Sequence, residues 1–424
     1  MPDRKHSPTI VDAVNFNLQL KPYRKITLNN GVEVIAIDAG AEEVMMIEWV
    51  FFAGNWFEKQ NLIAATANFL LRNGTSQKTA YQINEHFDYY GSYLNRACFN
   101  ETASVTLHSL TRHIGELLPL VREMFTDSQI PEEELAIFKQ NSKQRLKVSL
   151  KKSDFIAGRL IDSCLYGEEH PYGRYTNMED FDAINRDDVD AFYKKYYRQG
   201  KFIVFVAGRL PSNLEELLEK NFGDLPQNYE PVQDILINPA SEKKYRIIND
   251  AAGVQGSIRI ARPFPNRHHP DFLKTQVLNA LFGGFFGSRL MSNIREDKGY
   301  AYGVHSYLQS HVNHSAWMIS TEAGRDVSEA TITEVYHEMQ LLREGFIKDD
   351  ELALVKNYLM GSLLGDLDGP FQILGRWKNI ILNNLDESYF YNSINAIKTV
   401  TAEELRELAN KYLQPDQFYE MVVV

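Results

Sequence analysis

Histidines are the residues of this sequence most able to hold a catalytic metal, and the chain has 11 of them. A helical zinc site of a peptidase places two histidines four residues apart, with a glutamate beside one of them as the general base. No two histidines of this chain are four residues apart. The run from Gln82 to His86 would match the zinc-binding pattern H-x-x-E-H if Gln82 were a histidine. Glutamine, however, is a poor zinc ligand. We interpret this run as part of a helix surface.

Two other pairs of histidines are weaker candidates. His311 and His314 lie in a predicted strand or loop, and strand geometry would point their side chains to opposite faces. His268 and His269 precede Pro270 and indicate a loop before a helix. A metal site of the chain's own around His311 and His314 is therefore the least favoured alternative.

Other chemistry-bearing motifs are missing or incomplete. The sequence has no G-x-S-x-G nucleophile elbow and no P-loop. The glycine-rich run over residues 281–290 does not fit the dinucleotide-binding fingerprint. It predicts instead a place where the backbone approaches a neighbour closely.

Composition narrows the class of protein. The 424 residues, 44% hydrophobic and 24% charged, suit two soluble domains of about 200 residues each. A net charge of −11 excludes general binding to nucleic-acid phosphates. The cysteines, Cys98 and Cys164, are too few for a disulfide framework or a Cys-rich metal site. The polar N-terminus and the lack of a long apolar run predict no signal peptide and no membrane span, so we expect a cytoplasmic protein.

Three pairs of segments recur in the same order at a nearly constant distance. Residues 130–139 resemble 347–356 at an offset of 217 (347 − 130), and residues 186–196 resemble 402–412 at an offset of 216 (412 − 196). An amphipathic helix pattern begins at residue 114 and recurs at residue 332, an offset of 218 (332 − 114). Offsets that agree within two residues indicate an internal duplication.

The duplication predicts an α+β fold of two equivalent domains, each a mostly antiparallel sheet with helices packed on one face. We expect the first domain over residues 1–223, a proline-containing linker over 224–244 and the second domain over 245–424. The β-rich runs 32–37 and 44–52 open the first domain. Their expected counterparts in the second domain are residues 257–261 and 315–321.

Several motifs, taken in order, resemble a known family. They are Phe52-Ala-Gly-Asn-Trp-Phe-Glu58, Arg72-Asn-Gly-Thr75, His170-Pro-Tyr-Gly173 with residues 183–208 after it, Gly283-Gly-Phe-Phe-Gly-Ser-Arg-Leu290, and Asn293-Ile-Arg-Glu-Asp-Lys-Gly-Tyr-Ala-Tyr302. From about residue 30 to the C-terminus, the chain resembles the insulinase family of zinc metallopeptidases, which contains pitrilysin, insulin-degrading enzyme and the mitochondrial processing peptidase. The resemblance implies two half-units that face each other as a clamshell around a chamber.

The resemblance also implies a zinc site, and this sequence departs from it. Ala65 and Phe69 stand at the two histidine positions of the family's H-x-x-E-H motif, and Asn68 stands at its glutamate position. The family's third ligand is a downstream glutamate, but residues 139–152 contain no acidic residue. Because neither Ala nor Phe offers a lone pair, we expect this chain to bind no metal.

A second element of the family is retained. Family members carry an Arg and a Tyr that contact the substrate backbone near the scissile bond, and these correspond to Arg295 and Tyr302. An Arg presents a fixed fork of donors to a carbonyl or carboxylate, and a Tyr hydroxyl can donate to the oxyanion of a tetrahedral intermediate. From the residues alone, the alternative is that Arg295 pairs with Glu296 or Asp297 and that Tyr302 packs in a sheet.

The resemblance therefore implies a divided active site. We expect the zinc-less subunit of a two-chain bacterial peptidase, inactive alone, with zinc on a homologous partner subunit. This chain would close the chamber, bind unfolded peptides along a sheet edge and place Arg295 and Tyr302 over the partner's zinc; Gly283, Gly284 and Gly287 are expected to contact substrate. The alternative is a non-catalytic relative, either structural, like the core subunits of respiratory complexes, or peptide-recognising, like the α chain of the processing peptidase. Whether the isolated chain forms a homodimer stays open.

Overall fold

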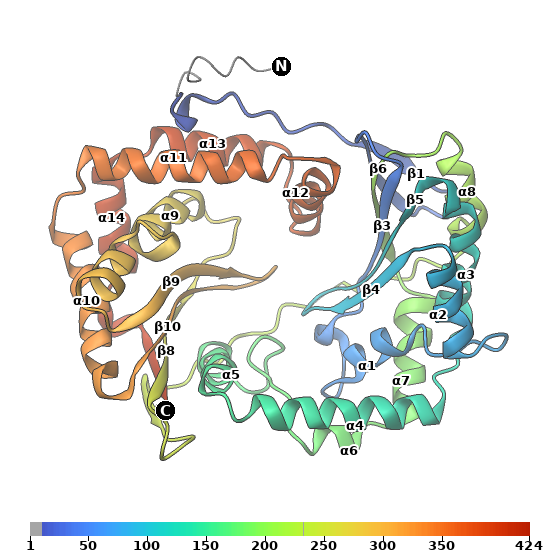
Figure 1. Cartoon of the computed structure of the whole chain (residues 1–424), viewed down its shortest axis with the longest axis horizontal. Helices are drawn as coiled ribbons and strands as arrows, with labels where there is room; N and C mark the ends of the chain where they lie inside the picture. The colour runs from blue at the N-terminus through green and yellow to red at the C-terminus, as the bar shows by residue number, and fades with distance from the viewer. Residues whose placement is uncertain (1–10, 232) are drawn as a thin grey trace.

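The computed structural model describes residues 11–231 and 233–424 and contains two β-sheets, one from each half of the chain (Figure 1). The first sheet has six strands in the order β1-β2-β6-β3-β5-β4. The second has five in the order β7-β11-β8-β10-β9. The strands are β1 (Arg24–Thr27), β2 (Glu33–Asp38), β3 (Val44–Phe51), β4 (Tyr93–Cys98), β5 (Ala103–Leu110), β6 (Phe202–Gly208), β7 (Lys244–Ile247), β8 (Gln255–Phe264), β9 (Ala301–Ser310), β10 (Ser315–Gly324) and β11 (Tyr419–Val423).

Helices are interspersed with the strands in each half, and the predicted α+β class with mostly antiparallel sheets is confirmed. None of the helices that the structure describes has the length and apolar sequence needed to cross a bilayer. In the first half they are α1 (Ile63–Leu70), α2 (Ala80–Tyr89), α3 (Ile114–Asp127), α4 (Glu132–Ser149), α5 (Ser153–Tyr166), α6 (Asp180–Ala183), α7 (Arg186–Tyr193) and α8 (Leu214–Phe222). In the second half they are α9 (Phe272–Asn279), α10 (Ser328–Glu344), α11 (Asp349–Gly365), α12 (Pro370–Leu382), α13 (Ser388–Thr399) and α14 (Ala402–Tyr412).

Strand pairing corrects the predicted counterparts of two strands. Each sheet contains one parallel pair, β2 with β6 and β7 with β11, so β7 is the equivalent of β2. By the same pairing, β8 is equivalent to β3 and β10 to β5. The predicted matches are therefore wrong: residues 257–261 correspond to β3 rather than to 32–37, and residues 315–321 correspond to β5 rather than to 44–52. The missed strand β7 has only four residues, too few for an alternating pattern to stand out.

Each sheet is also covered by a helix from the opposite half (Figure 1). Helix α5 of the first half packs on β8 and β11 of the second sheet, with Ile161 in the same apolar cluster as Met318. Helix α12 of the second half packs on β2 and β6 of the first sheet, with Trp377 in the same cluster as Phe205. This exchange of helices buries the second face of each sheet and ties the halves together.

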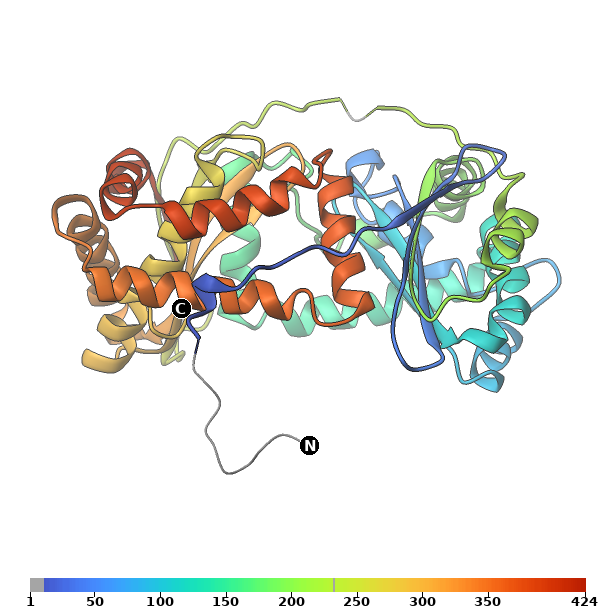
Figure 2. The same cartoon turned by 90° about the horizontal axis from the view of Figure 1, so that it is seen from above.

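Two extended connections run between the halves (Figure 2). One is the described chain before β1, and the other is the chain between α8 and β7, of which residues 223–231 and 233–243 are described. The segment before β1 belongs to the first half by sequence but contacts the second half. There the backbone N–H of Val14 donates to Asn357 at 3.0 Å, and Lys398 donates to the carbonyl of Phe16 at 3.0 Å. The other connection is held against the end of α5, where the N–H of Asn238 donates to the carbonyl of Tyr166 at 2.9 Å.

Candidate functional site

Helix α1 carries the three positions at which the resemblance places a zinc site, and all three make ordinary packing contacts. Ala65 borders a small pocket of about 190 Å³. Asn68 is 3% exposed, and its amide donates to the carbonyl of Ser104 at 3.3 Å. The ring of Phe69 packs on Phe138 of α4 at 4.9 Å between ring centres. Apolar and amide side chains thus stand at the three positions where ligands would be needed.

A guanidinium also lies at this place. Arg96 of β4 stacks over the ring of Phe69 at 4.7 Å and donates to the Phe69 carbonyl. Burial lowers the pKa of Arg96 to about 9, and nearby Arg72 adds to the shift, so Arg96 is still charged at neutral pH. A fixed positive charge repels a divalent cation, and these residues therefore do not fit zinc. Across residues 11–231 and 233–424, no group of three or more His, Cys, Asp or Glu is placed to hold a metal ion.

Arg295 and Tyr302 lie side by side in the second half. Arg295 is in the π-helical segment η6 (Met291–Asp297), and Tyr302 is near the start of β9. The guanidinium carbon of Arg295 is 5.3 Å from the centre of the Tyr302 ring and 4.6 Å from that of Phe286. Tyr302 is 92% exposed, and the salt bridges of the described residues include none of Arg295 with Glu296 or Asp297. The structure therefore shows an open, stacked pair rather than the internally satisfied alternative.

The glycine-rich segment positions this pair by packing on β9. It contains a second π-helical segment, η5 (Ala280–Gly284), of the kind that is enriched at functional sites. A Cβ atom on Gly283 would lie 2.7 Å from the Cβ of Ser306, so only glycine allows this approach. The predicted close backbone approach is confirmed, and the neighbour is β9. Gly284 is half-buried and Gly287 is exposed next to Phe286; the role of these glycines in substrate binding stays a prediction.

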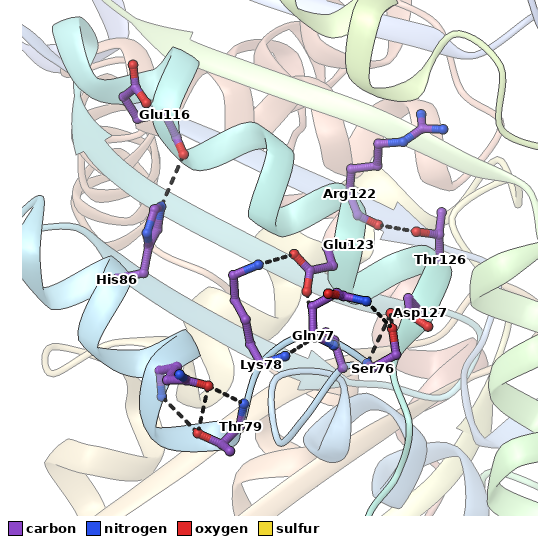
Figure 3. A network of polar contacts seen from close by, with 12 residues as sticks. Ser76, Gln77, Lys78, Thr79, His86, Glu116, Arg122, Glu123, Thr126 and Asp127 are labelled. Carbon is purple, nitrogen blue, oxygen red and sulfur yellow. Dashed lines mark hydrogen bonds and ion pairs between the residues drawn. The ribbon is translucent and has the colours of Figure 1, made fainter.

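The run from Gln82 to His86 is structural, as interpreted from the sequence. It lies in α2, where Thr79 and Gln82 form a capping box. His86 contacts the carbonyl of Glu116 at 3.1 Å through its ring nitrogen (Figure 3). An ion pair between Lys78 and Glu123, at 2.6 Å, holds the same turn against α3. His268 and His269 likewise precede α9 in a loop, as predicted.

His311 and His314 lie in the turn between β9 and β10, and the prediction that they point to opposite faces is wrong. Both rings join one aromatic cluster with residues of the first half. His311 stacks on Tyr172 at 4.1 Å, and His314 lies 5.6 Å from the ring of His170. The N–H of His311 donates to the carbonyl of His314 at 3.0 Å and closes a turn between them. The alternation of side chains along a strand therefore does not apply, and both side chains lie on one side.

This cluster predicts a pH-dependent stability. Burial lowers the pKa of His311 to about 4, and His170 and His314 add to the shift. An unfolded histidine titrates near pH 6.5, so between about pH 6.5 and 4 the unfolded chain binds a proton that the folded chain excludes. The contribution of His311 is complete above about pH 6.5 and is lost as the pH falls toward 4. We expect His311→Phe, which keeps a ring on Tyr172, to reduce this loss by up to about 3 kcal/mol in denaturant unfolding across that window.

The exposed His305 of β9 provides the control, and His305→Phe is expected to show the same pH profile as wild type. Burial raises the pKa values of Glu58 and Asp162 to about 7, so these two groups make the free energy of unfolding fall as the pH rises toward 7. All three proteins contain both groups, and their effect therefore cancels in the comparison. Parallel profiles for wild type and His311→Phe would show that His311 is not held neutral by the cluster.

Comparisons with known proteins extend this description. Residues 183–359 match the family model of the peptidase M16 inactive domain. The chain is 24% identical over 401 residues to YmxG, an uncharacterized zinc protease of Bacillus subtilis. This alignment covers 93% of this chain and 96% of YmxG. A solved M16 inactive domain from Pseudomonas fluorescens has a TM-score of 0.84 at 23% identity, covering 95% of this chain and 98% of that one. A protease from Helicobacter pylori has a TM-score of 0.85 at 17% identity, covering 96% and 100%.

The two superpositions are below 25% identity and show a shared fold. The family model covers the end of the first half and most of the second, including Arg295 and Tyr302. The relative from Bacillus subtilis spans nearly the whole chain. Together these findings show that residues 183–359 match a peptidase M16 inactive domain and that the chain shares its fold with solved M16 proteins.

Proposed function

We propose that this chain is the non-zinc subunit of a two-chain zinc peptidase, in which it closes the chamber and supplies Arg295 and Tyr302 to a peptide held over the zinc of a homologous partner subunit. The observation that carries the proposal is an open Arg295–Tyr302 pair in a chain whose own zinc positions hold Ala65, Asn68 and Phe69. Such a chain is equipped to bind a peptide beside a reaction centre, but it cannot build that centre itself.

The two side chains would have different roles. The guanidinium of Arg295 lies near the rings of both Phe286 and Tyr302, and its fork of donors would bind a carbonyl or carboxylate oxygen of the peptide. The exposed hydroxyl of Tyr302 would donate to the oxygen that becomes negative when the scissile carbonyl is attacked. Arg295 therefore mainly binds, and Tyr302 mainly stabilises the transition state.

The unfolded peptide would add to a sheet edge, and β4 and β9 are two of the four edge strands, which also include β1 and β7. On β9, the N–H of Val304 donates to a methionine sulfur at 3.4 Å, and the carbonyl of Ser306 accepts from Asn279 at 3.0 Å. On β4, the carbonyl of Leu94 accepts from an arginine at 3.2 Å, and α1 lies beside the strand. We propose that the peptide adds along one of these two edges.

The second candidate is a subunit with a structural or peptide-recognition role only. The match to an inactive domain is compatible with it. A scaffold, however, has no need of a tyrosine that is 92% exposed and lies against an arginine with which the described residues form no salt bridge, so the pair favours the catalytic subunit.

The metal content of the purified chain tests the proposed division of labour. We expect no stoichiometric zinc after dialysis against zinc, because Ala65 and Phe69 offer no ligand atoms and Arg96 adds a positive charge at the same place. Atomic absorption gives the ratio, with the zinc-bearing partner measured alongside as the positive control. One zinc per molecule of this chain would contradict the proposal.

A further inference from the structure

A pocket of about 380 Å³ lies in the second half, between β9 and helices α9, α11, α12 and α13. Its charged lining is basic only and consists of Arg267 and Arg376. Its other polar groups are amides and hydroxyls, including Ser362 and Tyr389. No Asp or Glu lines it, although the chain has 56 acidic and 45 basic residues. The pocket therefore has the opposite sign to the net charge of the protein.

Arg267 gives this pocket an uncompensated charge. Its Nε donates to the hydroxyl of Ser310 at 2.9 Å and another nitrogen donates to Asn379, so both acceptors are neutral. No carboxylate of the described residues forms a salt bridge with Arg267. Burial lowers the pKa of Arg267, and Arg376 acts in the same direction, yet a guanidinium keeps its proton at neutral pH. A partly buried cation without a counter-ion is complementary to an anion.

Arg376, the second cation, is only partly neutralised. It pairs with Asp366, a residue that does not line the pocket. Tyr389 lines the pocket together with both arginines, and their charges oppose the rise that burial causes in the pKa of its hydroxyl. Two guanidinium groups and a hydroxyl at one wall offer the planar, multiple donors that carboxylates accept.

The glycine-rich segment connects this pocket with the Arg295–Tyr302 pair. Gly284 lines the pocket, and Phe286, two residues further on, stacks on Arg295 at 4.6 Å. Phe285 lies between them and stacks on Tyr358 of the pocket lining at 4.5 Å. Two residues of extended chain span about 7 Å, so a peptide that lies against this segment can contact both places.

We infer that the pocket binds a carboxylate of the peptide, either an acidic side chain or the C-terminal carboxylate, and so makes this chain select acidic peptides. This inference rests on the proposed function and names its substrate class. A volume of about 380 Å³ is in the range of sites for small ligands and holds one side chain with part of its backbone. A charge-assisted contact with the arginines should favour the acidic peptide by roughly tenfold to a hundredfold in affinity.

Fluorescence anisotropy with the full-length chain tests the inference. The probes are labelled, unstructured Gly/Ser/Leu peptides with one glutamate at varied positions, their glutamine twins, and both forms with a free or an amidated C-terminus. We expect at least one glutamate peptide, or the free C-terminus, to bind roughly tenfold or more tightly than its neutral twin. The glutamine and amide arms show which carboxylate is recognised.

Variants locate the preference in the pocket. Arg267→Gln should abolish it, whereas Arg112→Gln, which removes the same charge from an exposed position of the first half, should keep it. Ser362→Glu, at an exposed position of α11, leaves both arginines in place and puts a carboxylate at the pocket, so it should also abolish the preference. This second variant keeps the test valid if Arg267→Gln unfolds at a lower temperature than wild type. Equal binding of charged and neutral peptides, or a preference that survives both pocket variants, would overturn the inference alone. Failure to bind any peptide would overturn the proposed function as well.

Discussion

Tyr302→Phe in this chain is expected to lower kcat for peptide cleavage by the two-chain complex by about 100-fold to 1,000-fold, the usual cost of losing one oxyanion donor. The substitution removes only the hydroxyl and keeps the ring that stacks on Arg295 at 5.3 Å. Because the hydrogen bond strengthens as charge develops, KM should change little. Steady-state kinetics with the reconstituted complex measure both constants.

Arg295→Ala should behave differently from Tyr302→Phe. It removes donors that bind the peptide before reaction, so we expect KM to rise and kcat/KM to fall by at least about tenfold. The control is Tyr307→Phe, because Tyr307 is an exposed tyrosine of the same strand that points to the other face. If Tyr302→Phe is as active as Tyr307→Phe, the pair has no catalytic role.

The second large effect is expected from Trp377→Ala, which should lower the free energy of unfolding by about 3–5 kcal/mol. Trp377 is 4% exposed, packs edge-on against Tyr23 at 4.6 Å, and donates from its indole N–H to the carbonyl of Lys21 at 2.9 Å. It belongs to α12, a helix of the second half that packs on the first sheet. The cavity left by alanine therefore lies at the junction of the two halves.

Denaturant unfolding followed by two probes measures this effect and its location. We expect one cooperative transition in wild type and a lower midpoint, with the two probes separating, in Trp377→Ala. Trp377→Phe keeps most of the buried area and should lose only about 1–2 kcal/mol, the cost of the unsatisfied carbonyl and the smaller ring. A loss below about 1 kcal/mol for Trp377→Ala would show that α12 does not hold the halves together.

Local sequence patterns were sufficient to predict the buried faces of two helices and the lack of zinc ligands. Helices α3 and α10 are buried along the apolar patterns that begin at residues 114 and 332, because a repeated apolar period records which side of a helix meets the core. Ala65 and Phe69 could be identified as lacking ligand atoms from residue type alone. The adjacency of Arg295 and Tyr302 followed from their spacing only through the family resemblance.

Features that depend on distant contacts could not be predicted in this way. The exchange of α5 and α12 between the sheets depends on packing between segments far apart in the chain, and an amphipathic helix does not record which sheet it will cover. Arg96 reaches Phe69 because β4 lies beside α1, which no local pattern reveals. The shared cluster of His311 and His314 required a turn that places both rings against Tyr172 of the other half.

Titration of the zinc-bearing partner with this chain tests the central claim of a divided active site most directly. The readout is the initial rate of peptide cleavage at a fixed concentration of the partner. We predict little cleavage by either chain alone and a rate that rises with added chain until the two are equimolar, with Tyr302→Phe saturating at the same ratio but at a far lower rate. Full activity of the partner alone, unchanged by this chain, would contradict the claim.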